Sequence, residues 1–549
     1  MRILVITNFY PPHHIGGYEL RCREVVDGLR SRGHAVRVLT GRYASGSVGG
    51  AEPHVHRKLH LSWGPPYPPE DLAGLLGAEA ADHRALADLC ADFRPEIIDV
   101  WGMEFASQSL VAALPASCMP VHLWLEDNWL LDGWSRDPLC QVAGVAERMG
   151  VVMEGAFGAL CCPAGARGHA ADAPITFVTS ALKDYYAKAG LVCPNSRVRP
   201  GGIDMATFRD LPGAPPPPPF VIVHAGQLTE SRGQNDLIAA AGLAATDTRC
   251  PFPVVVRIAG GGSPGYVAEL RRLADEHRSE RFRVEFVGIL PPDRMPELYA
   301  TGHLFVFTSR RAFEGLPRVM VEAMAAGLPM IATDTGGQRD ILADGRWGPL
   351  LPPGDRERLV RHILEAMTDY PARLERAREA REDAFERFDV EKCIEAYAAD
   401  LTRVAASQKA SEDEEHRTET AAFPLVTREE AGKLVETIGR AARQASVDAE
   451  RDPEQAWRLA VVLKRTGQLA EAEKLLRSLH ESYADDPVHV RRATFHLAEL
   501  AMPAGRWPDA QELLEACLSV APDHRKAAYD LDHACRRTLP EHLAGLARQ

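Results

Sequence analysis

Short apolar runs alternate with helical patterns twice along this chain, and five prolines at Pro215–Pro219 divide the two sets. The first set has an apolar run at Ile3–Ile6, then a glycine- and proline-bearing loop and a helical pattern that Gly33 is placed to end. A second run follows at Ala35–Leu39. Strand, helix and strand in this order favour parallel pairing, and continuous apolar runs are typical of strands buried on both faces. The sequence therefore predicts two doubly wound α/β domains.

Further apolar runs extend both predicted sheets. Because a proline run continues neither a helix nor a central strand, it is a stiff connector. We expect a first domain at 1–200, a second domain at 201–389 and a crossover helix at 390–406. The stretch 48–70 is rich in glycine, proline and histidine, which predicts a long loop. The additional strands are expected at Ile97–Trp101, Val121–Glu126, Ile175–Thr179, Arg197–Arg199, Phe220–Ala225, Val254–Ala259, Phe282–Val287, Leu304–Thr308 and Met330–Thr333.

The rest of the chain is predicted to be helical. The stretch 407–420 is polar, rich in charge and without an apolar period, and we expect a flexible acidic linker at 407–426. In 427–549, Asp-Pro pairs at 452–453 and 486–487 lie 34 residues apart, the tetratricopeptide period. This predicts an all-α, tetratricopeptide-like helical-repeat module, with an unrelated helical bundle as the alternative. So few repeats form a marginal core, so we expect the module to lean on itself or on the rest of the protein.

Composition narrows the class of protein. A formal net charge of −13 argues against an extended nucleic-acid surface. The 11 cysteines are scattered without a C-x-x-C pair, as expected of reduced thiols in a cytoplasmic protein. The N-terminal apolar run is read as a strand rather than a signal peptide, and no apolar run approaches the roughly 20 residues of a membrane span. No histidine or cysteine group has metal-ligand spacing, so no metal site is predicted.

The stretch FEGLPRVMVEAMAAGLPMIATDTGG at 313–337 carries the strongest functional signal. Glu314 follows a predicted strand, and Glu322 lies eight residues later, inside the next helix. The turn at 315–317 leads into that helix, and free N–H groups at a helix start attract phosphate. A carboxylate there can accept hydrogen bonds from sugar hydroxyls. By spacing alone, the pair could equally be solvated acids on a surface helix.

The whole stretch resembles the E-x7-E signature of retaining GT-B glycosyltransferases, specifically glycosyltransferase family 4. The similarity extends over about residues 1–405 and includes an N-terminal GG loop, a PGGID…F junction, a GQL…RG segment and an IAGGG turn. The resemblance implies two Rossmann-like domains and transfer of a hexosyl group from a nucleotide-diphosphate sugar with retention of configuration. The nucleotide sugar would be a co-substrate, with no cofactor, metal ion or protein nucleophile required.

The resemblance also implies roles for individual residues. Glu322 would bind the donor ribose, and Glu314 would lie near the donor sugar as a catalytic residue. The segment Gly288–Leu290 would border the nucleotide base. The implied donor-binding residues are Gly16, Gly17, Gln227, Arg232, Gly315, Leu316, Glu322, Gly336 and Gly337.

Two positions depart from the family pattern. Relatives bind the diphosphate with a G-R-L…K-G pair, in which Arg232 can replace the lysine but Gln227 cannot replace the arginine charge. Arg310 and Arg311 are the candidates for compensating basic groups. Relatives also often carry His-Asp after the strand at 121–125, where this chain has Glu126-Asp127.

Glu126 and Asp127 are nevertheless taken as candidate catalytic residues. Either would orient the donor or acceptor, and Asp127 would serve as a base. The alternatives are that this segment is not catalytic, or that the nearby His122 is the equivalent of the family histidine. Tyr397, in the expected crossover helix, is read as a packing residue.

The acceptor cannot be read from the sequence, and a saccharide, a lipid-linked molecule and a small molecule all stay open. Peripheral membrane contact and a protein partner for the helical module are further expectations. The main alternative is a catalytically degenerate glycosyltransferase scaffold that acts through this module as a protein-binding unit. A GT-B epimerase or phosphorylase is a third, less favoured hypothesis.

Overall fold

The computed structural model describes residues 1–42, 52–62, 71–114, 119–148, 173–213, 216–409, 428–445, 453–502, 504–521, 524, 526–527 and 530–531. Across these residues, none of the helices combines the length and the apolar character needed to cross a membrane. Most of the predicted linker, 410–426, lies outside the described residues.

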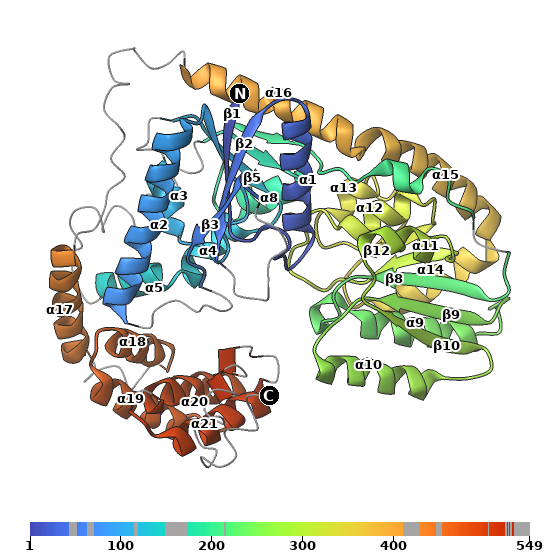
Figure 1. Ribbon diagram of the computed structural model, residues 1–549. Helices are drawn as coiled ribbons and strands as arrows, with labels where there is room; N and C mark the ends of the chain where they lie inside the picture. Colours follow the sequence, from blue (N-terminus) through green and yellow to red (C-terminus); the bar gives the residue numbers. More distant parts are fainter. Residues whose placement is uncertain are drawn as a thin grey trace, which may run out of the picture.

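A seven-stranded parallel sheet forms the core of the first domain, in the order β3-β2-β1-β4-β5-β6-β7 (Figure 1). The prediction of a parallel α/β domain is confirmed, but the stretch 48–70 is not all loop, because an edge strand forms within it. That strand pairs with Val38–Gly41 and is only partly buried, so it lacks the continuous apolar run of an inner strand. The strands are β1 (Arg2–Thr7), β2 (Ala35–Gly41), β3 (Val55–Leu59), β4 (Ile97–Val100), β5 (Val121–Leu125), β6 (Ile175–Phe177) and β7 (Ser196–Val198).

Helices connect these strands on both faces of the sheet, as parallel pairing requires. Apart from exposed Arg2, strands β1, β4 and β5 are buried along their whole length, which matches their mostly apolar sequences; Asp99 and His122 are the buried polar residues of β4 and β5. The described helices of this domain are α1 (Gly17–Ser31), α2 (Leu72–Phe93), α3 (Gln108–Ala113), α4 (Trp129–Arg136), α5 (Pro138–Arg148) and α8 (Ser180–Lys188).

The second domain repeats this architecture with a six-stranded parallel sheet in the order β10-β9-β8-β11-β12-β13. Its strands are β8 (Phe220–Ala225), β9 (Val254–Ala259), β10 (Phe282–Gly288), β11 (Leu304–Phe307), β12 (Met330–Thr333) and β13 (Leu350–Leu351). Its described helices are the short η2 (Met205–Phe208), η3 (Glu230–Arg232) and η4 (Pro292–Arg294), with α9 (Gln234–Thr246), α10 (Pro264–His277), α11 (Met295–Tyr299), α12 (Arg318–Ala325), α13 (Gln338–Ile341), α14 (Arg356–Thr368) and α15 (Tyr370–Arg387).

The chain crosses between the two domains twice, and the two crossings lie side by side. The Ile203 N–H donates to the Phe388 carbonyl at 2.9 Å, and the Val390 N–H donates to the Ile203 carbonyl at 3.0 Å. After the second crossing, α16 (Val390–Lys409) runs back over the first domain, so the predicted crossover helix is three residues longer than expected (Figure 1). Packing of α16 against α1, β4 and β5 anchors the return.

Tyr397 of α16 packs as expected and also joins a buried polar network. Its hydroxyl donates to Asp99 at 2.7 Å, and Asp99 binds Nδ1 of His122 at 2.8 Å. The other ring nitrogen of His122 lies 2.9 Å from the Thr176 hydroxyl. Both ring nitrogens of His122 are therefore bound within the sheet core.

Beyond α16, the described residues form five helices that pack in sequence order. These are α17 (Arg428–Ala445), α18 (Pro453–Arg465), α19 (Leu469–Ser482), α20 (Pro487–Ala501) and α21 (Trp507–Val520). Their identity as tetratricopeptide repeats stays a prediction. Helices α17 and α18 pack on α2 and α5 of the first domain, and Ile438 and Leu459 belong to the same hydrophobic cluster as the first sheet. The module therefore leans on the first domain, below it in Figure 1.

Candidate active site

The carboxyl ends of the two sheets meet across the domain boundary. In each sheet the strand order reverses beside the first strand, β1 or β8, and parallel sheets bind ligands at such a point. Ser180, after β6, donates its backbone N–H to Asp340 of the second domain at 2.8 Å. The rings of Tyr185 and Phe313 lie 4.7 Å apart, centre to centre. The predicted site residues lie along this boundary.

Glycines make the closest approach between the domains possible. A Cβ atom on Gly315 would lie 1.8 Å from the Glu126 carbonyl oxygen, and one on Gly337 would lie 1.6 Å from the Gly315 carbonyl oxygen. Gly336 has a φ of +141° and pairs with Glu314 in an isolated bridge. Only glycine fits this stack of backbones. The structure thus brings Gly315, Gly336 and Gly337 together as one wall.

The GG loop after β1 faces the second domain. Gly16 donates its N–H to the Glu19 side chain at 3.0 Å and precedes the first residue of α1. A Cβ atom on Gly17 would lie 3.7 Å from the Arg318 Cβ atom. The free amides at the start of α1 therefore lie next to the start of α12, so two helix N-termini border one space.

Glu322 is buried in α12, and both of its carboxylate oxygens have partners. The Tyr299 hydroxyl donates to one at 2.9 Å, and Nε of Arg318 donates to the other at 3.0 Å. Burial raises the pKa of Glu322, and Arg318 and Tyr299 act against that rise. Arg318 also forks onto Glu24 of α1 with contacts of 2.8 and 2.9 Å, which ties the two domains together. Neither Arg318 nor Glu24 was a sequence candidate, although Arg318 lies one helical turn before Glu322 and the spacing could have indicated it.

Glu314 is also buried, and basic groups surround it. Nη1 of Arg232 and the Ser309 hydroxyl each lie 2.5 Å from one oxygen, and Arg311 lies 3.9 Å from the other. Burial lowers the pKa of Arg232, and the Glu314 charge acts against that effect. The structure therefore places Arg232 and Arg311 beside the first glutamate of the motif, and Leu316 is buried next to it.

In the part of the chain that the structure describes, the other predicted contributors do not contact Glu314 or Glu322 through a hydrogen bond or ion pair. Arg310 forks onto Asp236, which Arg356 also binds at 2.6 Å, so Arg310 belongs to a separate ion-pair cluster and not to the Glu314 site. The Gln227 side chain is exposed after β8, and its carbonyl accepts a hydrogen bond from Gln234. Ile289, in the segment predicted to border the base, is 80% exposed at the end of β10.

Glu126 and Asp127 differ in their surroundings. Nη1 of Arg21 lies 2.5 Å from one Glu126 oxygen, and the Trp124 indole donates to the other at 2.7 Å, all within the first domain. Glu126 therefore meets the second domain with its backbone, and its carboxylate is buried against Arg21 and Trp124 of the first domain, whereas the sequence led us to expect it to face the ligands. Asp127 is partly exposed; burial, with repulsion from Glu126 and Glu19, raises its pKa to about 7.

A carboxyl group with a pKa near neutrality can exchange protons at physiological pH. Asp127 is thus the described carboxyl group of this segment that suits acid–base chemistry. Within the described ranges, no three histidine, cysteine or acidic side chains are grouped closely enough to hold a metal ion.

Comparisons with known proteins bear on the second domain and on the fold. Residues 212–384 match the family model described as glycosyl transferases group 1. N-acetyl-alpha-D-glucosaminyl L-malate synthase from Bacillus anthracis is 26% identical over 32% of this chain and 44% of its own length. A GDP-mannose-dependent alpha-(1-6)-phosphatidylinositol monomannoside mannosyltransferase from Mycobacterium tuberculosis is 27% identical over 36% of this chain and 52% of its own. The chain thus spans about half the length of these curated relatives.

Solved structures share the arrangement of the first two domains. Sucrose-phosphate synthase from Thermosynechococcus elongatus is 20% identical with a TM-score of 0.54 and covers 74% of this chain and 99% of its own. Anabaena HepE, solved with UDP and glucose, is 23% identical with a TM-score of 0.53 and covers 73% of this chain and 100% of its own. These likenesses show the fold, and residues 212–384 are the part that the group 1 family model describes.

Proposed function

We propose that this protein, which has the two-domain GT-B fold and a group 1 glycosyltransferase domain, transfers a hexosyl group from a nucleotide-diphosphate sugar to an acceptor with retention of configuration. One observation carries the proposal: buried Glu314 and Glu322 lie at the carboxyl edge of the matched domain, opposite the Gly16–Gly17 loop. A relic without a ligand has no need for that combination.

The second domain would hold the donor. Glu322 accepts hydrogen bonds from the ribose, and Arg318 favours its ionised form against the effect of burial. Glu314 lies near the sugar, with Arg232 and Arg311 close to the diphosphate. The backbone amides of Gly17 and Gly315 add donors that a side chain could not place so near, while the Gly16 N–H is held by Glu19.

The chemistry follows from where negative charge develops. As the sugar leaves, the diphosphate gains charge, which cations and oriented amides stabilise without a metal ion. The acceptor attacks from the same face, and Asp127 takes the proton from its hydroxyl group. The acceptor lies on the first domain.

The test is thermal unfolding with UDP, GDP, ADP and TDP and their common sugars. A ligand at about 100 times its Kd adds about 2.7 kcal/mol to the free energy of unfolding, which gives a clear rise in Tm. We expect a rise with one base that Glu322→Ala abolishes and that Glu269→Ala, an exposed acid in α10 of the same domain, preserves. The anomeric proton of the product, followed by NMR during turnover, then tests retention.

A well-folded protein whose Tm responds to no nucleotide would contradict the proposal. The degenerate scaffold would then be favoured, and its helical module would become the part to study. Inversion at the anomeric carbon would leave the transferase activity standing and refute the retaining mechanism.

A further inference from the structure

Arg21 is an arginine buried inside the first domain, with 1% of its surface exposed. It lies in α1, and its Nη1 atom contacts Glu126 at 2.5 Å in an ion pair whose side chains are 2% and 8% exposed. Among the described residues, its Nε and Nη2 atoms have no hydrogen-bond partner. A buried pair with unsatisfied donors contributes little net stability, because desolvation offsets the attraction. This favours a role in placing other groups.

On one side, Arg21 supports the connection between the domains. A Cβ atom on Gly201 would lie 2.2 Å from Nε and 2.6 Å from Cζ of Arg21, so the first crossing rests on the guanidinium plane. The next residue, Gly202, lies against the second crossing, because its Cβ atom would be 2.5 Å from the Val390 Cα atom. Both crossings therefore lie within two residues of contact with Arg21.

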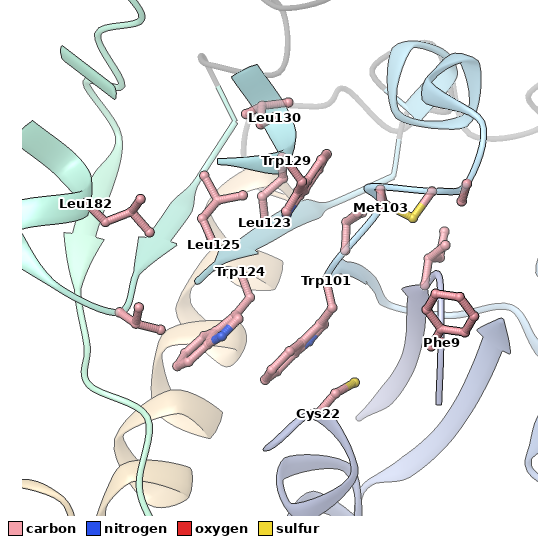
Figure 2. Close-up of a cluster of buried hydrophobic side chains, with 14 of the residues drawn as sticks. Phe9, Cys22, Trp101, Met103, Leu123, Trp124, Leu125, Trp129, Leu130 and Leu182 are labelled. Atoms are coloured by element: carbon pink, nitrogen blue, oxygen red, sulfur yellow. The ribbon is translucent and has the colours of Figure 1, made fainter. Parts of the chain in front are cut away.

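On the other side, Arg21 fixes the end of β5. The indole N–H of Trp124 donates a hydrogen bond to Glu126, the partner of Arg21. The Trp124 ring stacks on Trp101, with the ring centres 4.9 Å apart (Figure 2). The same Trp124 ring meets Tyr397 of α16 edge-on at 4.7 Å. Glu126 is thus clamped between an arginine of α1 and an aromatic group that α16 covers.

Two groups at the domain boundary depend on where Glu126 lies. Its carbonyl oxygen touches Gly315, the residue after Glu314. Asp127, the next residue, is the partly exposed carboxyl group whose pKa Glu126 helps to raise. A shift of the β5 end would therefore change both the closure of the domains and the surroundings of Asp127.

We propose that Arg21 is a positioning residue that transmits the interdomain connection to the reacting groups: the first crossing rests on its guanidinium, the second crossing packs on the first, and its bond to Glu126 sets Asp127 and the Glu126 carbonyl against Gly315. This inference rests on the proposed function. In this chain the residue set against the histidine of relatives is Glu126, and we infer that its buried ion pair with Arg21 holds the end of β5 in place.

The experiment compares Arg21→Met and Glu126→Gln with Arg199→Met in the full chain. Arg199 is a matched control, because it binds Asp400 of α16 at 2.8 Å beside the same crossing but does not contact Glu126. The readouts are kcat and donor KM for transfer, or for donor hydrolysis while the acceptor is unknown, and the pH profile of kcat. All are measured well below the Tm of each variant.

We expect Arg21→Met and Glu126→Gln to lower kcat by about 10-fold or more with donor KM nearly unchanged, since a small misplacement of reacting groups costs rate and not donor contacts. In Glu126→Gln, the acid limb of the profile moves to lower pH, because Asp127 loses a neighbouring negative charge. Arg199→Met keeps the wild-type kcat and profile.

Gly201→Ala is a second route to the same state, because its methyl group would displace the guanidinium. It should reproduce the loss of kcat. If Arg21→Met and Gly201→Ala lower Tm but retain kcat and the acid limb, Arg21 is merely structural and the inference is overturned. If the wild type binds no nucleotide, the proposed function fails instead, so the two failures are distinguishable.

Discussion

The Gly315 backbone lies directly under the Glu126 carbonyl, so close that a Cβ atom on Gly315 would be 1.8 Å from that oxygen. The position of Gly315 in the second domain therefore depends on the position of Glu126 in the first domain. The glutamate that precedes Gly315 and the aspartate that follows Glu126 are the two carboxyl groups we assign to the reaction. The contact between the closed domains therefore brings these two carboxyl groups to the same boundary.

Gly315→Ala should block this closure. The methyl group has backbone on the opposite side, which cannot rotate away, so we expect kcat/KM to fall by about 100-fold or more. Donor binding to the second domain alone should weaken less. Steady-state kinetics and nucleotide titration measure the two effects, with Gly265→Ala in α10 as the control, because nothing lies within 4 Å of its Cβ position. Wild-type kinetics in Gly315→Ala would show that this closed arrangement is not the reactive one.

Asp127→Asn should remove the acid limb of the pH–rate profile. A base acts only when deprotonated, so activity in the wild type should rise as pH increases through about 7, the pKa of Asp127. The amide keeps the shape but cannot accept a proton, so kcat should fall by about 100-fold and lose its dependence on pH in this range. An unchanged limb in the variant would assign the titration to another group.

Tyr299→Phe should weaken donor binding through Glu322. The lost hydroxyl leaves one oxygen of a buried carboxylate without its 2.9 Å donor, which costs about 1–3 kcal/mol and raises the proton affinity of Glu322. We expect nucleotide Kd to rise by about 10-fold at neutral pH, and more at lower pH, as calorimetric titration would measure. Equal affinity at all pH values would mean that Glu322 does not bind the ribose.

Arg311→Ala should change donor binding, whereas Arg310→Ala should change thermal stability. Arg311 is half exposed beside Glu314, so its removal should raise the donor KM with little change in Tm. Arg310 is bound to buried Asp236, so its removal should lower Tm and preserve nucleotide affinity. Differential scanning fluorimetry and donor titration separate the two. Loss of affinity in Arg310→Ala would place it at the diphosphate after all.

Ile438→Asp should detach the helical module from the first domain. Ile438 of α17 is fully buried in the cluster shared with that domain, and a charge there costs several kcal/mol in packing and desolvation. We expect faster proteolytic cleavage between α16 and α17, followed by mass spectrometry, and a lower Tm. Substitution of exposed Lys433 on the same helix by Ala is the control. Unchanged cleavage would show that docking does not depend on this contact.

Local sequence signals were sufficient for the order of elements and for the centre of the motif. Buried parallel strands need continuous apolar runs, and helix starts that face phosphate need glycine turns, so β1, β8, α12 and the pair Glu314 and Glu322 follow from neighbouring residues alone. Strand β3 was missed because an edge strand needs no such run, and its pairing with β2 is a contact that exists only in the folded sheet.

Contacts between distant residues decided the rest. The sequence determined that Glu126 and Arg21 are charged, but 105 positions separate them, and only the packing of α1 against the end of β5 joined them and turned the Glu126 carboxylate inward. In the same way, the sequence offers Arg310 and Arg311 as equivalent basic neighbours of Glu314. In the folded chain Arg310 binds Asp236 of α9 instead. An ion pair forms only between charged groups that lie close together in space, and those distances are set by the tertiary structure.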